Sequence, residues 1–226
     1  MRFIVYIVLH CAILLTGCWS NPFIDWNEHS NDPNNKYRSG FIAQYHTIND
    51  KVIIHKRVNS SGYVIDFSTY RDNLDTFIAD YFGGERYHQI KTKYGDTKDR
   101  WEWCDPNDIA YSESISSIDI ITHNNWNTTH LAGSNINDIF DIRYATYKYY
   151  VDSGFDDTFF DSYSREVWEE RRASELKEGD MWFIHTSFQL ICKHKHDSNE
   201  IHPISVVLNL DSGREQIYNI NVNYHN

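Results

Sequence analysis

The C-terminal stretch PISVVLNLDSGREQIYNINVNY (203–224) constrains the fold more than any other part of the chain. Large apolar residues take every second position on both sides of an Asp-Ser-Gly turn, with Ile204, Val206, Leu208 and Leu210 before it and Tyr218, Ile220, Val222 and Tyr224 after it. A period of two puts side chains on one face of a strand, and two such runs around a turn form an antiparallel hairpin. The chain therefore contains a sheet with one buried face.

Several earlier stretches also have the β-branched and aromatic composition of strands. They span residues 41–47, 51–58, 62–68, 114–122 and 137–151. A further strand is expected at 181–192, where one side carries Trp182, Ile184, Thr186, Phe188, Leu190 and Cys192. We expect this strand to pair with the C-terminal hairpin. Short strands separated by turn residues indicate a mainly β fold, an immunoglobulin-like antiparallel β-sandwich.

Two stretches have helical spacing and are expected as insertions in the sandwich. In residues 68–84, Leu74, Phe77, Ile78 and Tyr81 recur at i, i+3, i+4 and i+7, and a Gly-Gly pair follows them. Residues 164–179 begin with a capping Ser164 and end at Gly179, with acidic residues early and a lysine late. The second helix has a narrow apolar face, so we expect it to be mostly solvated.

The N-terminus has the features of an export signal. Residues 1–17 form an apolar run after one positive charge at Arg2, and this run is shorter than the roughly 20 residues of a membrane span. It ends in Leu15-Thr16-Gly17-Cys18, which is similar to the bacterial lipobox. In proteins with that pattern the Cys thiol is alkylated with diacylglycerol and the signal peptide is cut before it. We therefore expect Cys18 to be the lipid anchor, the alternative being an unmodified Cys18 in a secreted protein.

The rest of the chain divides into a tether and a domain. Residues 18–39 are rich in Asn, Pro, Ser and Asp and lack apolar periodicity, so they predict a flexible segment between membrane and domain. Residues 40–226 are then a single β-rich domain. Removal of Arg2 with the signal peptide takes the formal charge from −11 to −12, which disfavours nucleic acid as a partner.

Two cysteines remain once Cys11 is removed with the signal peptide and Cys18 is lipidated. Cys104 and Cys192 are the candidates for a disulfide, which an oxidising compartment permits. Two unpaired, buried thiols are the alternative.

Two stretches in the second half of the chain resemble a known family. SSIDIITHNNWNTTHLAGSNINDIFDIRY (116–144) and FQLICKHKHDSNEIHPISVVLNLDSGREQIYNI (188–220) are similar to uncharacterised lipoproteins of Bacteroidota. Those chains have a lipobox, a strand that enters an AGSxLNDxF-like turn, and a last hairpin with Asp-Gly in its turn. Here Ile136 replaces the Leu, and Ser212-Gly213 replaces the direct Asp-Gly. The resemblance implies an exported lipoprotein with an immunoglobulin-like domain, and it implies no catalytic residues.

Two stretches have residues that could bind a ligand. In CKHKHDSNEIHP (192–203), an extended strand would place Cys192, His194 and His196 on one side, with His202 close in sequence, as candidate zinc or copper ligands. A polar hairpin loop is the alternative. In RWEWCDP (100–106), Trp101 and Trp103 would share a face and could stack on a glycan, the alternative being core packing.

The sequence favours a binding or scaffolding role over catalysis. It contains no Gly-x-Ser-x-Gly, His-Glu-x-x-His or Cys-x-x-Cys motif, and no catalytic residues and no cofactor are expected. We expect an exported, non-enzymatic envelope lipoprotein on the outer membrane, with a protein or glycan as ligand. The sequence does not decide between the periplasmic side and the surface side of that membrane. Two alternatives remain. One is a secreted glycoprotein of the virulence or immune-modulating kind, with sequons at Asn59 and Asn127, and the other is a periplasmic metal-binding protein.

Overall fold

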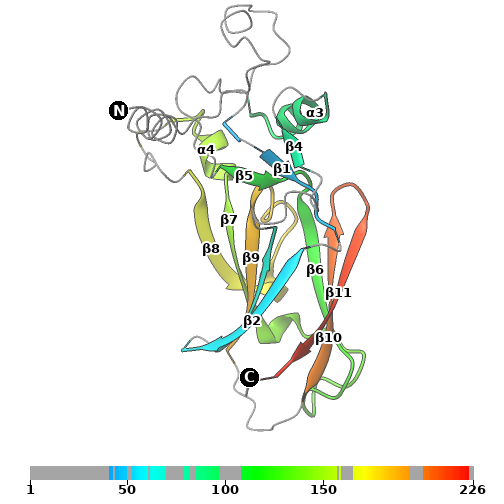
Figure 1. Ribbon diagram of the computed structural model, residues 1–226. Coiled ribbons are helices and arrows are strands. Elements are labelled where there is room, and N and C mark those ends of the chain that lie inside the picture. The colour runs from blue at the N-terminus through cyan, green and yellow to red at the C-terminus, as the bar shows by residue number, and fades with distance from the viewer. Residues whose placement is uncertain are drawn as a thin grey trace, which may run out of the picture. The chain divides into compact units, whose positions relative to one another are not determined.

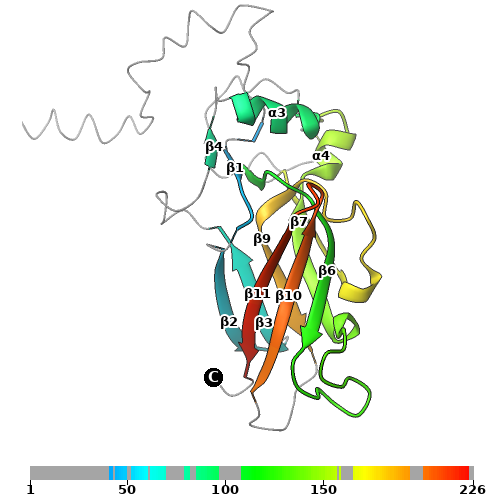
Figure 2. The ribbon, with the colours of Figure 1, turned by 90° about the vertical axis from the view of Figure 1, so that its right-hand side faces the viewer.

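The C-terminal hairpin forms most of the smaller of two sheets (Figures 1 and 2). It consists of β10 (His202–Leu210) and β11 (Glu215–Val222), and β6 (Ile115–Thr122) pairs with the other side of β10. The expected alternation is confirmed: Ile204, Val206, Leu208 and Leu210 are buried, as are Tyr218, Ile220 and Val222. The turn between the strands needs a residue with positive φ, and Gly213 supplies it at +81°.

The structure is a computed structural model that describes residues 41–42, 44–49, 52–60, 62–69, 79–81, 85–96, 108–156, 158, 165–193 and 201–223. All of them belong to one compact unit, Ser39–Asn226. Among these residues, no helix has the length and apolar character needed to cross a membrane.

The larger sheet has eight strands. Its main part runs in the order β2 (Ile53–Asn59), β3 (Gly62–Ser68), β9 (Ile184–Cys192), β7 (Phe140–Thr146) and β8 (Val167–Arg172), with every neighbouring pair antiparallel. Beyond the end of β3, the same side of β9 pairs with β5 (Ile109–Tyr111) through Ala110 and His185. The short strands β1 (Gln44–His46) and β4 (Ala79–Tyr81) extend the sheet beyond β5, with β1 and β5 parallel.

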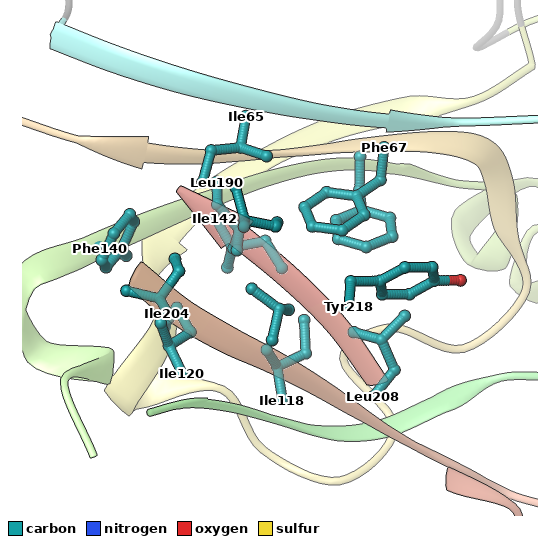
Figure 3. Close-up of a cluster of buried hydrophobic side chains, with 14 of the residues drawn as sticks. Ile65, Phe67, Ile118, Ile120, Phe140, Ile142, Leu190, Ile204, Leu208 and Tyr218 are labelled. Carbon is teal, nitrogen blue, oxygen red and sulfur yellow. The ribbon is translucent and has the colours of Figure 1, made fainter. Parts of the chain in front are cut away.

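The two sheets pack face to face as a mainly β sandwich. Figure 3 shows the main core, where Ile65, Phe67, Leu190 and Ile142 from the larger sheet meet Ile118, Ile120, Ile204, Leu208 and Tyr218 from the smaller one. Phe67 stacks on Phe188 with the ring centroids 4.6 Å apart, and Tyr218 meets the edge of Phe67 from the opposite sheet. The sandwich-like, mainly β architecture expected from the sequence is therefore confirmed.

A second core, rich in aromatic residues, lies at one end of the sandwich (Figure 1). It gathers residues of β1, β5, the helix α3 (Glu85–Lys93) and the short helix α4 (Lys148–Asp152). Tyr94 and Phe183 stack almost in parallel, with ring centroids 4.3 Å apart, and Phe41 meets the edge of Tyr150 at 5.0 Å. Asp96 is fully buried beside this core and accepts hydrogen bonds from the backbone N–H groups of Phe41 and Ile42, at 2.8 and 3.3 Å.

The structure corrects the second expected helix and the end of the first. Residues 167–172 of the second one form β8, and Ala173–Glu175 make a short 3₁₀ turn. Ladder pairing with β7 outweighs the local helix propensity of this Glu- and Arg-rich stretch. At the end of the first, Ala79–Tyr81 form β4, and the helix α3 begins after the Gly-Gly pair, at Glu85. Residues 70–78 lie outside the described residues.

Two further expectations about strands need correction. The strand at 181–192 does not pair with the C-terminal hairpin, because β9 lies in the larger sheet between β3 and β7. The side expected to be apolar does face the core, and Ile184, Phe188, Leu190 and Cys192 are buried there. The strand expected over 137–151 spans only Phe140–Thr146, with the 3₁₀ helix η2 (Asn137–Ile139) before it and α4 after it.

The Ala-Gly-Ser-Asn-Ile-Asn-Asp turn (132–138) lies along the outer edge of β6. The Asn137 side chain pairs with the strand backbone, because its Oδ1 accepts from Ile120 N at 2.8 Å and its Nδ2 donates to Ile118 O at 2.7 Å. Backbone bonds from Ile136 N to Ile120 O and from Gly133 N to Thr122 O continue the pairing. The turn thus covers part of an edge that would otherwise present unpaired backbone groups.

Candidate functional site

The face of the larger sheet that points away from the core carries rows of charged and polar side chains across five strands. We call it the outer face and define it by the alternate residues of β2, β3, β9, β7 and β8 that do not enter the core. In one row these are Arg57, Val64, Ile191, Asp141 and Arg172, and in the next His55, Asp66, Gln189, Arg143 and Glu170. The strand register brings each row together from distant parts of the chain.

One end of the outer face is an ion-pair network around Asp141. This carboxylate is nearly buried and lies 3.2 Å from Arg172 Nε and 2.5 Å from Lys193 Nζ. Lys193 also binds Glu170 at 3.0 Å. The hydrogen bonds to Asp141 and then to Glu170 raise the pKa of Lys193, so the lysine stays charged. The network fixes the positions of these side chains on the face.

Next to the network, Arg143 stacks on an exposed tryptophan. The guanidinium carbon lies 4.8 Å from the ring centroid of Trp168, which keeps 44% of its surface accessible. Glu170 is opposite Arg143 in the register, but it is engaged by Lys193. Among the residues that the structure describes, Arg143 has no side-chain ion-pair or hydrogen-bond partner. Its guanidinium lies over the Trp168 ring instead. A planar cation over an aromatic ring, with its N–H donors uncommitted, is suited to bind a ligand.

The opposite face of β8 is committed to internal contacts. Glu169 accepts hydrogen bonds from Tyr144 at 2.8 Å and from Tyr149, and it pairs with Arg171, which also binds Asp180 at 2.7 Å. Burial by itself would raise the pKa of Glu169, but the hydrogen bonds from the two tyrosines and the charge of Arg171 outweigh it and lower the pKa. Glu169 is therefore a fixed carboxylate that orients Tyr149 at the sheet edge.

An acid–histidine–hydroxyl chain lies in the loop after β6, but its geometry does not suit nucleophilic catalysis. His130 Nε2 lies 3.0 Å from Asp138 Oδ1, and its Nδ1 lies 3.1 Å from Thr129 Oγ1. The Thr129 hydroxyl lies closer to Asn127 Oδ1, at 2.8 Å, so it donates to that amide rather than to the histidine. The Asn127 amide also accepts from the backbone N–H groups of Thr129 and His130. The chain shapes the loop.

A pair of histidines lies where β1, β5 and β9 meet. His46 is buried, with Nδ1 2.9 Å from Thr69 Oγ1. His185 Nδ1 lies 3.1 Å from Ser187 Oγ. Burial lowers the pKa of each histidine to about 4, so both are neutral at pH 7. Neutral, hydrogen-bonded histidines at this place stabilise the junction of the strands.

Most of the residues singled out from the sequence lie outside the described residues: Cys18, Trp101, Trp103, Cys104, His194 and His196. Cys192 is buried at the end of β9. Its pairing with Cys104 stays a prediction, because Cys104 lies outside the described residues. His202 faces the main core, where its ring lies 4.8 Å from that of Trp126. Over the described ranges, no group of three or more His, Cys, Asp or Glu residues is arranged to hold a metal.

The sequence pattern does not single out Arg143 and Trp168. Trp168 lies in the stretch 164–179, where the spacing predicts a helix, but residues 167–172 form a strand. The run Val-Trp-Glu-Glu-Arg-Arg has no apolar–polar alternation that would identify this strand or its faces.

No protein-family model, no curated protein and no solved structure matches this chain. The functional assignment therefore depends on the residues and contacts described above.

Proposed function

We propose that the protein is an exported bacterial envelope lipoprotein, anchored through Cys18, whose β-sandwich domain binds a ligand and does not catalyse a reaction. The location is inferred from Leu15-Thr16-Gly17-Cys18 at the end of the N-terminal apolar run. The Asn- and Pro-rich stretch 18–39 would then separate the domain from the membrane.

The observation that carries the binding role is the stacked pair of Arg143 and Trp168 on the outer face. Monomeric proteins expose single large apolar residues often, but here the ring lies against a cation that no carboxylate neutralises among the described residues. Both partners lie on paired strands, β7 and β8, which hold them more rigidly than a loop would. A rigid, prearranged contact surface favours recognition.

Intact-mass measurement of the mature protein, isolated from membranes of its native host, tests the anchor. We expect a chain that begins at Cys18 and carries two or three acyl chains, and a Cys18→Ala variant that is not lipidated. An unlipidated chain that begins at or beyond Trp19 would contradict the anchor and would make the protein a secreted one.

A secreted glycoprotein is a second candidate, favoured by the geometry of one sequon. Asn127 is exposed, and the hydrogen bonds of its side chain with Thr129 and His130 all use Oδ1. In the described part of the chain its Nδ2, the atom that an N-glycan would modify, has no hydrogen bond. The same intact-mass measurement separates the two candidates, because a glycan at Asn127 adds hexose masses and acyl chains at Cys18 do not.

A further inference from the structure

The Arg143–Trp168 pair offers a ligand two kinds of contact. The guanidinium carbon is 4.8 Å from the indole centroid, so the cation stacks on one side of the ring, and 44% of the Trp168 surface remains accessible. Stacking uses the face of the guanidinium and leaves the N–H groups at its edge free to donate. An apolar surface and a set of parallel donors therefore lie next to each other.

The charges around the pair indicate the sign of the ligand. Arg143, Arg172 and Lys193 are the cations at this end of the outer face, and Asp141 and Glu170 are the anions. Both anions are engaged, since Asp141 pairs with Arg172 and Lys193, and Glu170 pairs with Lys193. Among the described residues, Arg143 is the cation at this end of the face that has no carboxylate partner. A guanidinium fork binds a carboxylate or a phosphate group in a bidentate manner.

We propose that the Arg143–Trp168 pair binds a carboxylated sugar of the uronic acid class. The inference rests on the proposed binding role of the outer face and names its ligand. A pyranose ring has an apolar C–H face that covers an indole, and its carboxylate reaches the donor edge of the stacked guanidinium. The Gln189 side chain, next to Arg143 in the register, can donate to or accept from ring hydroxyls.

Titration calorimetry on the full domain, supported by Trp fluorescence, tests the proposal with trisaccharides of galacturonate, glucuronate and mannuronate. We expect at least one of them to bind, and its fully methyl-esterified form to bind at least tenfold more weakly, because the ester removes only the charge. Arg143→Ala and Trp168→Ala should each weaken binding at least tenfold. Arg143→Lys should weaken it less than Arg143→Ala, because it keeps the charge and loses the fork.

The matched control is Arg86→Ala. Arg86 is an exposed arginine on α3, outside the outer face, and it donates to Thr47 Oγ1 at 3.1 Å, so its loss should leave binding within twofold. Absence of binding by all three uronates at millimolar concentration would overturn the proposal. Equal binding of the acid and its ester, or equal binding of a poly-glutamate peptide of the same charge, would overturn the sugar assignment. The anchor at Cys18 is measured separately by mass, so neither result bears on it. Binding of the peptide would still support the proposed binding role of the outer face.

Discussion

At the scale of single residues, Gly62 shows how close the hairpin of β2 and β3 comes to β9. Its φ is +123°, and a Cβ at this position would lie 2.2 Å from the Cys192 carbonyl oxygen. Because that neighbour is backbone, no rotation of a side chain can relieve the overlap. The conformation and the space both require glycine at this position.

We therefore expect Gly62→Ala to destabilise the domain by at least about 3 kcal/mol, since strand β3 or β9 must shift. Gly133→Ala is the matched control, because Gly133 also has positive φ, at +85°, but a Cβ there meets nothing within 4 Å. The control should lose only the conformational part, about 1–2 kcal/mol. Urea unfolding of both variants measures the difference, and equal losses would contradict the contact with Cys192.

Asp96 is a buried carboxylate at the residue scale. Burial is the main cause that raises its pKa to about 6, and the hydrogen bonds from Phe41 and Ile42 only partly oppose it. The folded protein therefore binds the Asp96 proton more tightly than the unfolded chain does. Its contribution to stability is present below the ordinary pKa of 3.8 and is lost as pH rises to about 6.

Removal of this carboxylate should change the slope of stability with pH. In the wild type, Asp96 should lower the unfolding free energy by about 3 kcal/mol as pH rises from 4 to 6. In Asp96→Asn we expect this loss to be absent from the pH profile. Asp152→Asn removes one exposed carboxylate and serves as the charge control. An unchanged slope in Asp96→Asn would show that the carboxylate is not the source.

At the scale of elements, β6 depends on a side chain for part of its edge pairing. The Asn137 amide bonds both Ile120 N and Ile118 O, as a neighbouring strand would. These backbone groups lie at a sheet edge, so loss of their partner exposes a template for pairing with another chain.

For Asn137→Ala we expect a destabilisation of about 1–3 kcal/mol and faster aggregation, because one donor and one acceptor of β6 lose their partner. Asn221→Ala on the exposed face of β11 is the matched control and should stay within about 0.5 kcal/mol of the wild type. Thermal unfolding with light scattering measures both effects. Equal behaviour of the two variants would mean that the edge is protected by other groups.

Strands β8 and β9 differ in how far sequence could predict them. Strand β9 has a core side on which Ile184, Phe188, Leu190 and Cys192 are apolar, and this period of two identifies both the strand and its buried face. Strand β8 has residues with good helix propensity and weak alternation, so its local preference was for a helix. Pairing with β7 decides its structure, and that pairing lies between residues about 25 positions apart.

At the scale of the whole molecule, the histidine pair and Asp96 act in opposite directions on acid stability. The pKa of His46 and of His185 is lowered to about 4 from an ordinary 6.5, so the unfolded chain binds those protons more tightly. Their contribution to stability is present above pH 6.5 and is lost as pH falls to about 4. Each amounts to about 3 kcal/mol, against about 3 kcal/mol in the other direction for Asp96.

We expect a net loss of about 2–3 kcal/mol in the unfolding free energy between pH 6.5 and pH 4. His185→Gln should reduce this loss, and Asp96→Asn should increase it. His55→Gln, which removes an exposed histidine on β2, is the control. Denaturant unfolding at several pH values gives the slopes, and a steeper acid loss in His185→Gln would contradict the assignment.

The sequence by itself determined the mainly β class, the C-terminal hairpin and the buried faces of β9, β10 and β11, because these follow from the local period of two. It also supplied the expectations of a signal peptide and a lipidated Cys18, which depend on short contiguous patterns. Only the tertiary structure decided which strands are neighbours, that 167–172 is a strand, and that Arg143 stacks on Trp168. These depend on contacts between distant residues, and a local pattern has no information on its partner across a sheet.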